Sequence, residues 1–262
     1  MCVDSGLNIV KYNILYMQYT FIPFSEGFGA QLQKLIWIIL YVESIGGEFV
    51  YTPFSSMAHN YTNQVDFIDN IENYIGLKDK YINNDEKLII KPNIVDVRSA
   101  LNAIESNINL HHSTPIFYGL RDKFLLNKHT PYDPSSTHVA VHVRRPNSHD
   151  NRIEGTDTPD SYYLSIMYNI REARKDKHLT FHIYSQGDET SFSLYLNIKD
   201  NNTDIKLHIN KSIPETFNGL LFSNILITSK SSLSYIAAIL SKAEVHYKKF
   251  WHPPLSHWKS YD

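Results

Sequence analysis

The sequence predicts an α/β protein built from parallel sheets in two consecutive units. In its second half, short β-branched runs alternate with longer stretches whose apolar residues recur at helical spacing. A looser version of this alternation fills the first half, and the polar stretch 129–136 (HTPYDPSS) between the halves is typical of a linker. Strict alternation of strand and helix favours parallel sheets covered by helices on both faces.

The first unit is predicted from three segments and a polar middle. We expect a strand around 9–19, a helix at 29–44 and a strand at 48–51. The helix contains the apolar run 35–42, which is about half the length of a membrane span, so it is interpreted as a buried helix. Helical apolar spacing continues through the Asn-, Asp- and Lys-rich region 60–109.

The second unit is predicted to begin with a strand at 137–143. A helix at 158–175 follows, because Pro159 suits the first helical position and an acid follows it near the positive end of the helix dipole. Its buried stripe is Tyr163, Ile166, Met167 and Ile170. The remaining elements are strands at 179–185, 205–209 and 225–228 and helices at 189–198, 214–222 and 231–241.

Composition excludes several classes of protein. The chain has 262 residues and a net charge of −2, so no overall field attracts nucleic acid or anionic membranes. Its one cysteine, Cys2, excludes an intramolecular disulfide framework and zinc sites built on several cysteines. The first residues lack the pattern of a secretory signal. We therefore expect a soluble cytoplasmic protein without a transmembrane span; its oligomeric state stays open.

The strongest local motif is His142-Val143-Arg144-Arg145, where a predicted strand delivers two arginines into the loop at its carboxyl end. Parallel α/β sheets bind ligands at that edge. Guanidinium groups pair bidentately with phosphate and suit a leaving diphosphate. The alternative is an arginine pair that makes only surface or interdomain salt bridges.

Two further loops follow predicted strands. Ser229, Ser231 and Ser232 precede the last predicted helix, where hydroxyls and free amides bind anions, although serine also caps helices without any ligand. The turn Ser185-Gln186-Gly187-Asp188 offers a sharp bend and an acid that can accept hydrogen bonds from a base or ribose. An ordinary strand-to-helix turn is the alternative there.

A fourth motif opens the first long helix. It reads Gly27-Phe28-Gly29-Ala30-Gln31, and two glycines at a helix start permit close approach of a ligand. The motif lacks the third glycine of a dinucleotide fingerprint.

In this order, the four motifs resemble the fucosyltransferase superfamily, over roughly residues 25–241. The resemblance implies a GT-B fold, with two Rossmann-like domains facing a cleft. By that resemblance Arg144 grips the donor β-phosphate with His142 beside it, and Ser229, Ser231 and Ser232 complete the phosphate site. Likewise, Asp188 with Ser185 and Gly187 lies near the base or ribose, and the loop of Gly27, Gly29 and Gln31 faces the reaction centre.

The domain division that follows is 1–130 for the acceptor side and 131–245 for the nucleotide sugar, with the tail 246–262 packing back on the first domain. The tail contains the aromatic run Phe250–Trp258. Packing is the preferred interpretation of this run, because a tryptophan beside prolines buries much area without a ligand.

The predicted function is an inverting transfer of a sugar from a nucleotide-sugar donor to a glycan hydroxyl. GDP-fucose is the donor that the resemblance implies, and UDP-xylose is a second choice because Ala30 and Pro146-Asn147 depart from the family pattern. A base must take the acceptor proton, and we expect Asp150, then Glu154, in the loop after Arg145. A non-catalytic carbohydrate- or nucleotide-binding module is the alternative.

No metal or other cofactor is expected. The chain contains no Asp-x-Asp motif, so a metal-bridged diphosphate site is disfavoured, and arginine would take the place of the divalent cation.

Overall fold

The computed structural model describes residues 17–60, 63–81, 91–146 and 157–262, and the α/β class with parallel sheets is confirmed. The first unit holds a three-stranded parallel sheet in the order β2-β1-β3. Its strands are β1 (Gln18–Thr20), β2 (Glu48–Phe49) and β3 (Asn93–Ile94). Its helices are α1 (Phe28–Ser44), α2 (Phe67–Ile75), the 3-10 turn η1 (Lys78–Lys80), α3 (Val97–Glu105), α4 (Ile108–His112) and α5 (Pro115–Leu125).

The second unit holds a six-stranded sheet in the order β6-β5-β4-β7-β8-β9, and its strand pairs are parallel. The strands are β4 (Thr137–His142), β5 (Leu179–Ser185), β6 (Thr203–Ile209), β7 (Ile225–Ile227), β8 (Glu244–Lys248) and β9 (Lys259–Tyr261). The helices are α6 (Asp160–Ala173), the 3-10 turn η2 (Glu189–Phe192), α7 (Ser193–Leu196), α8 (Ile213–Leu221) and α9 (Ser232–Leu240).

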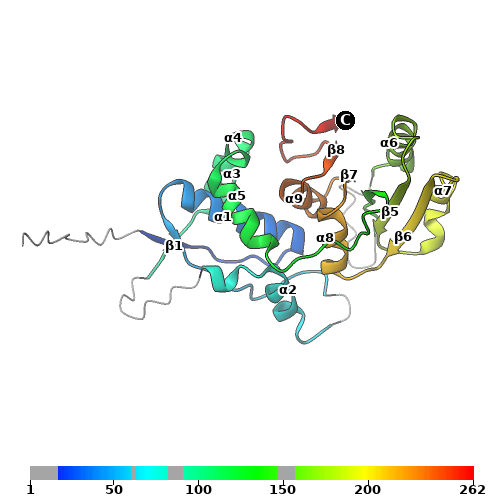
Figure 1. Cartoon of the computed structure of the whole chain (residues 1–262). Coiled ribbons are helices and arrows are strands. Elements are labelled where there is room, and N and C mark those ends of the chain that lie inside the picture. Colours follow the sequence, from blue (N-terminus) through cyan, green and yellow to red (C-terminus); the bar gives the residue numbers. More distant parts are fainter. Residues whose placement is uncertain (1–16, 61–62, 82–90, 147–156) are drawn as a thin grey trace, which may run out of the picture.

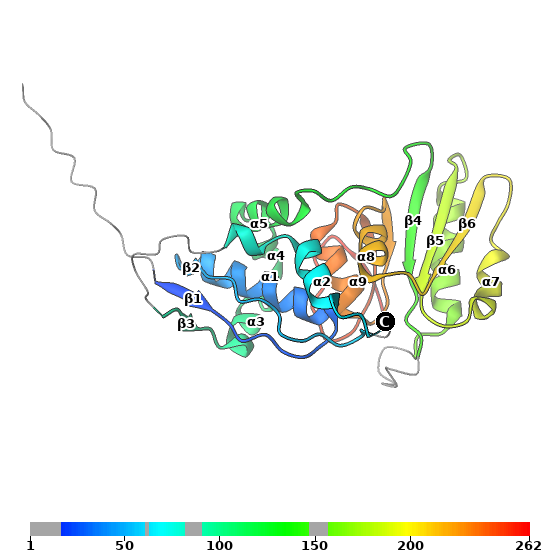
Figure 2. The same cartoon turned by 90° about the horizontal axis from the view of Figure 1, so that it is seen from below.

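The alternating side chains of β4 explain how both faces of this sheet are covered. Its valines, Val139 and Val141, share a core with the predicted stripe of α6, which is buried as expected. On the opposite face, Ala140 belongs to a second core that also includes residues of α8, α9 and α1. Figures 1 and 2 show α8 and α9 between α1 and the large sheet. The two units therefore share one continuous core.

The tail contains two strand segments that were not predicted. Residues 246–248 belong to β8 and 259–261 form β9, so both ends of the tail extend the large sheet. The physical reason is that β7 would otherwise end the sheet with unpaired backbone groups. Between these strands, His252 contacts Glu105 and Ser256 contacts Asn109, both in the first unit.

Other differences are local. The predicted helix at 189–198 is a 3-10 turn followed by the four-residue α7. Helix α5 was not predicted, although Thr114 caps it and Pro115 starts it, which is a recognisable start signal. Of the predicted strand at 9–19, the structure describes only the end, where β1 begins at Gln18.

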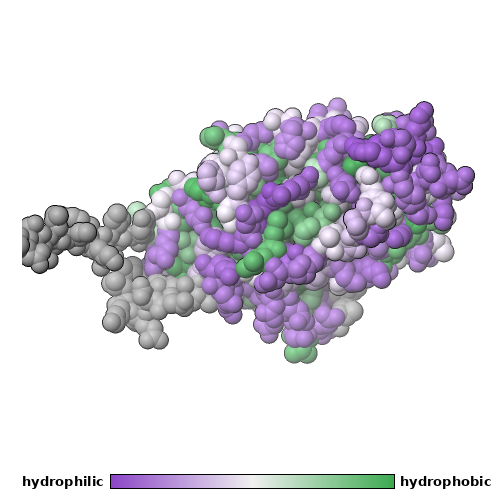
Figure 3. Space-filling model, in the orientation of Figure 1, coloured by the Kyte–Doolittle hydropathy of each residue, from purple (hydrophilic) through white to green (hydrophobic). Residues whose placement is uncertain are grey.

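The surface view in Figure 3 is mostly hydrophilic, with a narrow hydrophobic band along its middle. Among the described residues, no helix combines the length and apolar character that crossing a bilayer requires.

Three histidines form a hydrogen-bonded row across β4, β5 and β6. The Asp133 carbonyl can only accept, so His138 donates to it from Nε2 at 2.7 Å. His138 Nδ1 then accepts from His182 Nε2 at 3.0 Å, and His182 Nδ1 accepts from His208 Nε2 at 2.9 Å. The Asp133 carbonyl thus sets the direction of the hydrogen bonds along the row.

This row predicts acid sensitivity. Burial, with the nearby His208 and His138, lowers the pKa of His182 to about 3. A lowered histidine pKa means that stability is complete above about pH 6.5 and is lost as the pH falls toward 3, because the unfolded chain takes up the proton first. Protonation of His182 in the unfolded chain should by itself lower the free energy of unfolding by about 2 kcal/mol at pH 5. Urea unfolding at pH 7 and pH 5 measures this fall in the free energy of unfolding. His182→Phe should show a smaller fall between the two pH values. An equal fall would contradict the assignment of the acid sensitivity to His182.

Candidate functional site

The strand order places one loop pair at the point where ligands bind in doubly wound sheets. Numbered by chain order, the six-stranded sheet reads 3-2-1-4-5-6, and its order reverses between β4 and β7. Ligands of such sheets bind beyond the carboxyl ends of the strands at this reversal. The loop after β4 contains Arg144, and the loop after β7 contains Ser229 and Ser231 and leads into Ser232, the first residue of α9. The topology therefore brings two predicted motifs together.

The two adjacent arginines have different partners. Arg145 forms an ion pair with Asp160, which also accepts a 2.6 Å hydrogen bond from the Tyr195 hydroxyl. Arg145 thus anchors the start of α6. Arg144 donates from Nη1 to the Lys230 carbonyl at 3.3 Å, and so it joins the loops after β4 and β7. Of the pair, Arg144 is the guanidinium at the reversal point.

His142 and Ser229 lie beneath this loop pair. Both side chains are buried, and His142 Nδ1 lies 2.8 Å from Ser229 Oγ. Burial, with the adjacent Arg144 charge, lowers the pKa of His142 to about 3. The ring is therefore neutral at physiological pH. In this position the pair supports the backbone next to Arg144.

The loop after β7 forms the capped start of α9. Ser231 is the N-cap, and its Oγ accepts from the Leu233 amide at 3.2 Å. Lys230 contacts Asp157 at 3.0 Å, and this hydrogen bond lowers the pKa of Asp157. Helix amino ends favour anions. Because Lys230 is paired with Asp157, the groups that favour an anion here are Arg144 and the amino end of α9.

The turn after β5 is ordered by its own side chains. Ser185 is buried and donates to the Val143 carbonyl at 2.6 Å, which ties β5 to the end of β4. Gly187 has φ of +114°, a conformation that favours glycine, and Asn210 bonds both its amide and its carbonyl at 2.9 Å. Asp188 is exposed and caps η2 by accepting from the Thr190 amide, a bond that lowers its pKa.

The glycine motif at the start of α1 needs a correction. A Cβ on Gly29 would lie 2.5 Å from Leu233 Cα and 2.9 Å from the Ser232 carbonyl carbon. The close approach is therefore to the backbone of α9 rather than to a ligand. Gln31 donates to the Ser56 carbonyl at 2.9 Å, while its buried Oε1 has no partner among the described residues. On Gly27 a Cβ would meet the His59 ring.

The predicted base residues Asp150 and Glu154 lie outside the described residues. One polar cluster that the sequence did not predict lies beside Ser232: the imidazole of His252 bonds the carboxylate of Glu105 at 2.8 Å. These two residues are 147 positions apart, so no local motif links them. Their only sequence signal was the aromatic tail that contains His252.

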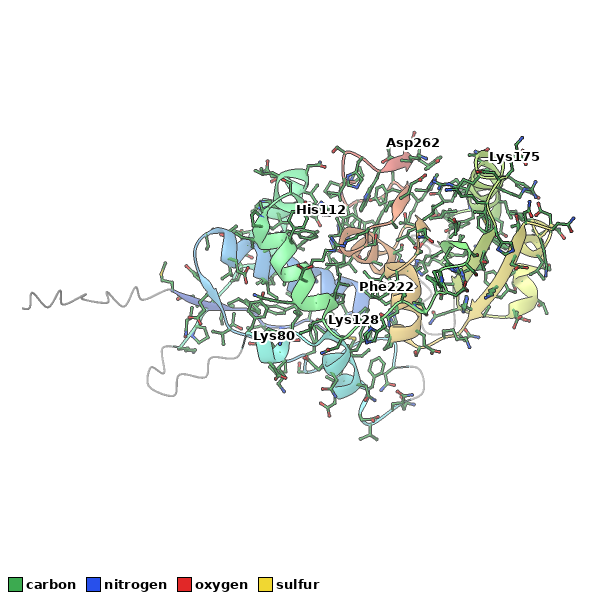
Figure 4. The ribbon with its side chains drawn as sticks, viewed as in Figure 1. Lys80, His112, Lys128, Lys175, Phe222 and Asp262 are labelled. Atoms are coloured by element: carbon green, nitrogen blue, oxygen red, sulfur yellow. The ribbon has the colours of Figure 1, made fainter. Side chains whose placement is uncertain are left out.

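Two cavities lie elsewhere. One of about 310 Å³ is lined by Lys80 and Lys128, and one of about 250 Å³ by Lys175 at the amino edge of the large sheet. Figure 4 labels these lysines. Lys128 donates to the Ile75 and Phe124 carbonyls near the ends of two helices, which is a structural role. Topology and chemistry therefore favour the β4–β7 edge over the cavities. Within the described parts of the chain, no cluster of three or more His, Cys, Asp or Glu side chains is arranged to hold a metal ion.

No protein-family model matches this chain, and no curated protein matches it in sequence. A mutant of Arabidopsis thaliana FUT1 in complex with GDP is 12% identical with a TM-score of 0.43, over 88% of this chain and 70% of that one. POFUT1 in complex with GDP is 10% identical with a TM-score of 0.47, over 87% of this chain and 95% of that one.

A third structure, NodZ alpha-1,6-fucosyltransferase soaked with GDP-fucose, is 11% identical with a TM-score of 0.36, over 86% of this chain and 93% of that one. These structures are of fucosyltransferases, and each is similar to this chain over most of its length.

Proposed function

We propose that this chain is an inverting, metal-independent glycosyltransferase that moves a sugar from a nucleotide diphosphate donor to a glycan hydroxyl. One observation carries the proposal. At the reversal point of the large sheet, Arg144 is tied to the Lys230 carbonyl beside the amino end of α9. This places a permanent cation and a helix dipole at the position where such sheets bind phosphates.

The chemistry follows from the leaving group. As the acceptor oxygen attacks the anomeric carbon, the bond to the donor β-phosphate oxygen breaks and the diphosphate gains negative charge. Arg144 and the first amides of α9, with the hydroxyls of Ser231 and Ser232, would stabilise that charge more in the transition state than in the bound donor.

The donor and the domain roles belong to the same proposal. In it, residues 131–245 hold the nucleotide sugar and residues 1–130 face the acceptor. GDP-fucose is the first donor to test because the motifs resemble fucosyltransferases, and UDP-xylose is the second. In the proposal, the exposed Asp188 turn, which lies at the same sheet edge, contacts the base or ribose.

A thermal-unfolding series is the test. The purified chain is heated with GDP, UDP, ADP, GDP-fucose and UDP-xylose, each with EDTA or manganese. A ligand that binds only the folded chain raises its Tm. We expect one nucleotide, with its sugar conjugate, to raise Tm equally in EDTA and manganese, and that donor to support transfer to a glycan.

Different outcomes lead to different conclusions. A shift that appears only with manganese would contradict metal independence. Binding without acceptor-dependent nucleotide release would assign the chain to the alternative class, a non-catalytic nucleotide-binding module. No shift with any nucleotide would overturn the proposal.

A further inference from the structure

A carboxylate–imidazole–hydroxyl chain spans the two units beside the proposed donor site. Glu105, the last residue of α3, accepts with Oε1 from His252 Nδ1 at 2.8 Å. The same oxygen accepts from Gln33 Nε2 at 2.9 Å and from Trp37 Nε1 at 3.2 Å, both on α1. Three donors therefore hold this carboxylate in place.

The indole of Trp251 fixes the tautomer of His252. An indole N–H can only donate, and Trp251 Nε1 lies 3.1 Å from His252 Nε2. Nε2 must therefore carry the lone pair, and Nδ1 carries the proton that it donates to Glu105. The Ser232 hydroxyl lies 3.3 Å from the same Nε2. The ring is thus held in the tautomer in which Nε2 accepts a proton from a hydroxyl.

The His252 imidazole contacts the first residue of α9, close to the Lys230 carbonyl that Arg144 bonds. Ser232 is two residues after Lys230, whose carbonyl accepts from Arg144. Because consecutive Cα atoms are about 3.8 Å apart, the Cα atoms of Lys230 and Ser232 are at most about 7.6 Å apart. The His252 side chain is 11% exposed, and Trp251, which donates to its Nε2, is 61% exposed, so the imidazole is not fully enclosed by the protein.

Two other histidine–carboxylate pairs of the described residues lie at the amino edge of the sheet: His178 precedes β5 and lies 3.5 Å from Asp204, and His138, near the start of β4, lies 4.0 Å from Asp133. A third pair lies within β8, where His246 is 3.2 Å from Glu244. Only the carboxyl edge carries the proposed donor site. Among these pairs, Glu105–His252 is therefore the one placed for the transfer reaction.

We propose that His252 is the catalytic base of the transfer and that Glu105 is its positioning residue. This inference rests on the proposed function. In the step, the acceptor oxygen bonds to the anomeric carbon while its proton passes to His252 Nε2. The bond between the anomeric carbon and the phosphate oxygen breaks, and its electron pair leaves with the diphosphate beside Arg144. The imidazolium that forms is paired with the Glu105 carboxylate.

The test measures kcat and KM for transfer, and the nucleotide-induced change in Tm, in matched variants. His252→Gln should lower kcat about 100-fold or more while leaving the donor KM and the Tm change as in the wild type. Glu105→Gln should lower kcat at least about tenfold, because the neutral amide no longer pairs with the imidazolium that forms on His252. His178→Gln, the control at the opposite edge, should match the wild type.

Chemical rescue separates a catalytic from a structural role. Free imidazole should restore part of the kcat of His252→Ala, and a merely structural histidine would show no such recovery. Transfer by His252→Gln at the wild-type rate would overturn the inference and leave the proposed function intact. Labelling of Ser232 by a fluorophosphonate would also overturn it, since the imidazole would then activate that serine. A wild-type chain that binds no nucleotide would instead refute the proposed function, and the base assignment with it.

Discussion

Replacing Arg144 by alanine is expected to lower kcat/KM for sugar transfer by about 10³-fold, since in the proposed mechanism its guanidinium faces charge that develops mainly in the transition state. The nucleotide-induced rise in Tm should also disappear, because in the proposal the same group contacts the diphosphate of the bound donor. Steady-state kinetics and thermal unfolding, with the nucleotide that raises the Tm of the wild type, measure the two effects.

Two variants control this prediction. Arg144→Lys keeps the charge but loses the planar fork, so its activity should lie between those of the wild type and Arg144→Ala. Arg98→Ala removes an exposed arginine at the start of α3 and should leave both measurements unchanged. If a folded Arg144→Ala chain transfers sugar within tenfold of the wild-type rate, the role that the proposed mechanism gives to Arg144 is wrong.

Gly29→Ala is expected to produce the largest loss of stability, about 3 kcal/mol. The added Cβ would lie within 2.5 Å of Leu233 Cα, and the atoms it meets are backbone atoms of α9. Backbone in a packed helix cannot rotate away as a side chain can. Helices α1 and α9 must therefore separate, which opens the shared core and displaces the Ser231–Ser232 loop from Arg144. The nucleotide-induced Tm change should fall as well.

Gly119→Ala is the matched control for this variant. Gly119 lies within α5, and an added Cβ meets nothing within 4 Å. Alanine there should stabilise the chain by about 0.5–1 kcal/mol, because glycine in a helix interior loses more conformational entropy on folding. Equal stability of Gly29→Ala and the wild type in urea unfolding would show that α1 and α9 are not in this contact.

Much of the second unit was predictable from local pattern. The strand at 179–185 and the buried stripe of α6 follow from periodicity alone, because each side chain's direction repeats with the geometry of its own element. The position of Arg144 just after β4 followed from the alternating pattern of that strand. The weaker predictions, such as the helix at 189–198, rested on short segments in which tertiary contacts override propensity.

The sequence by itself determined the α/β class, most elements of the large sheet and the loops that end at its carboxyl edge. These are properties of neighbouring residues. Only the tertiary structure decided what depends on distant contacts: β9 as the sixth strand, Gly29 against the backbone of α9, and Glu105 bonded to His252. The physical reason is that such contacts join segments of unrelated sequence, so nothing in either segment indicates its partner until folding buries them together.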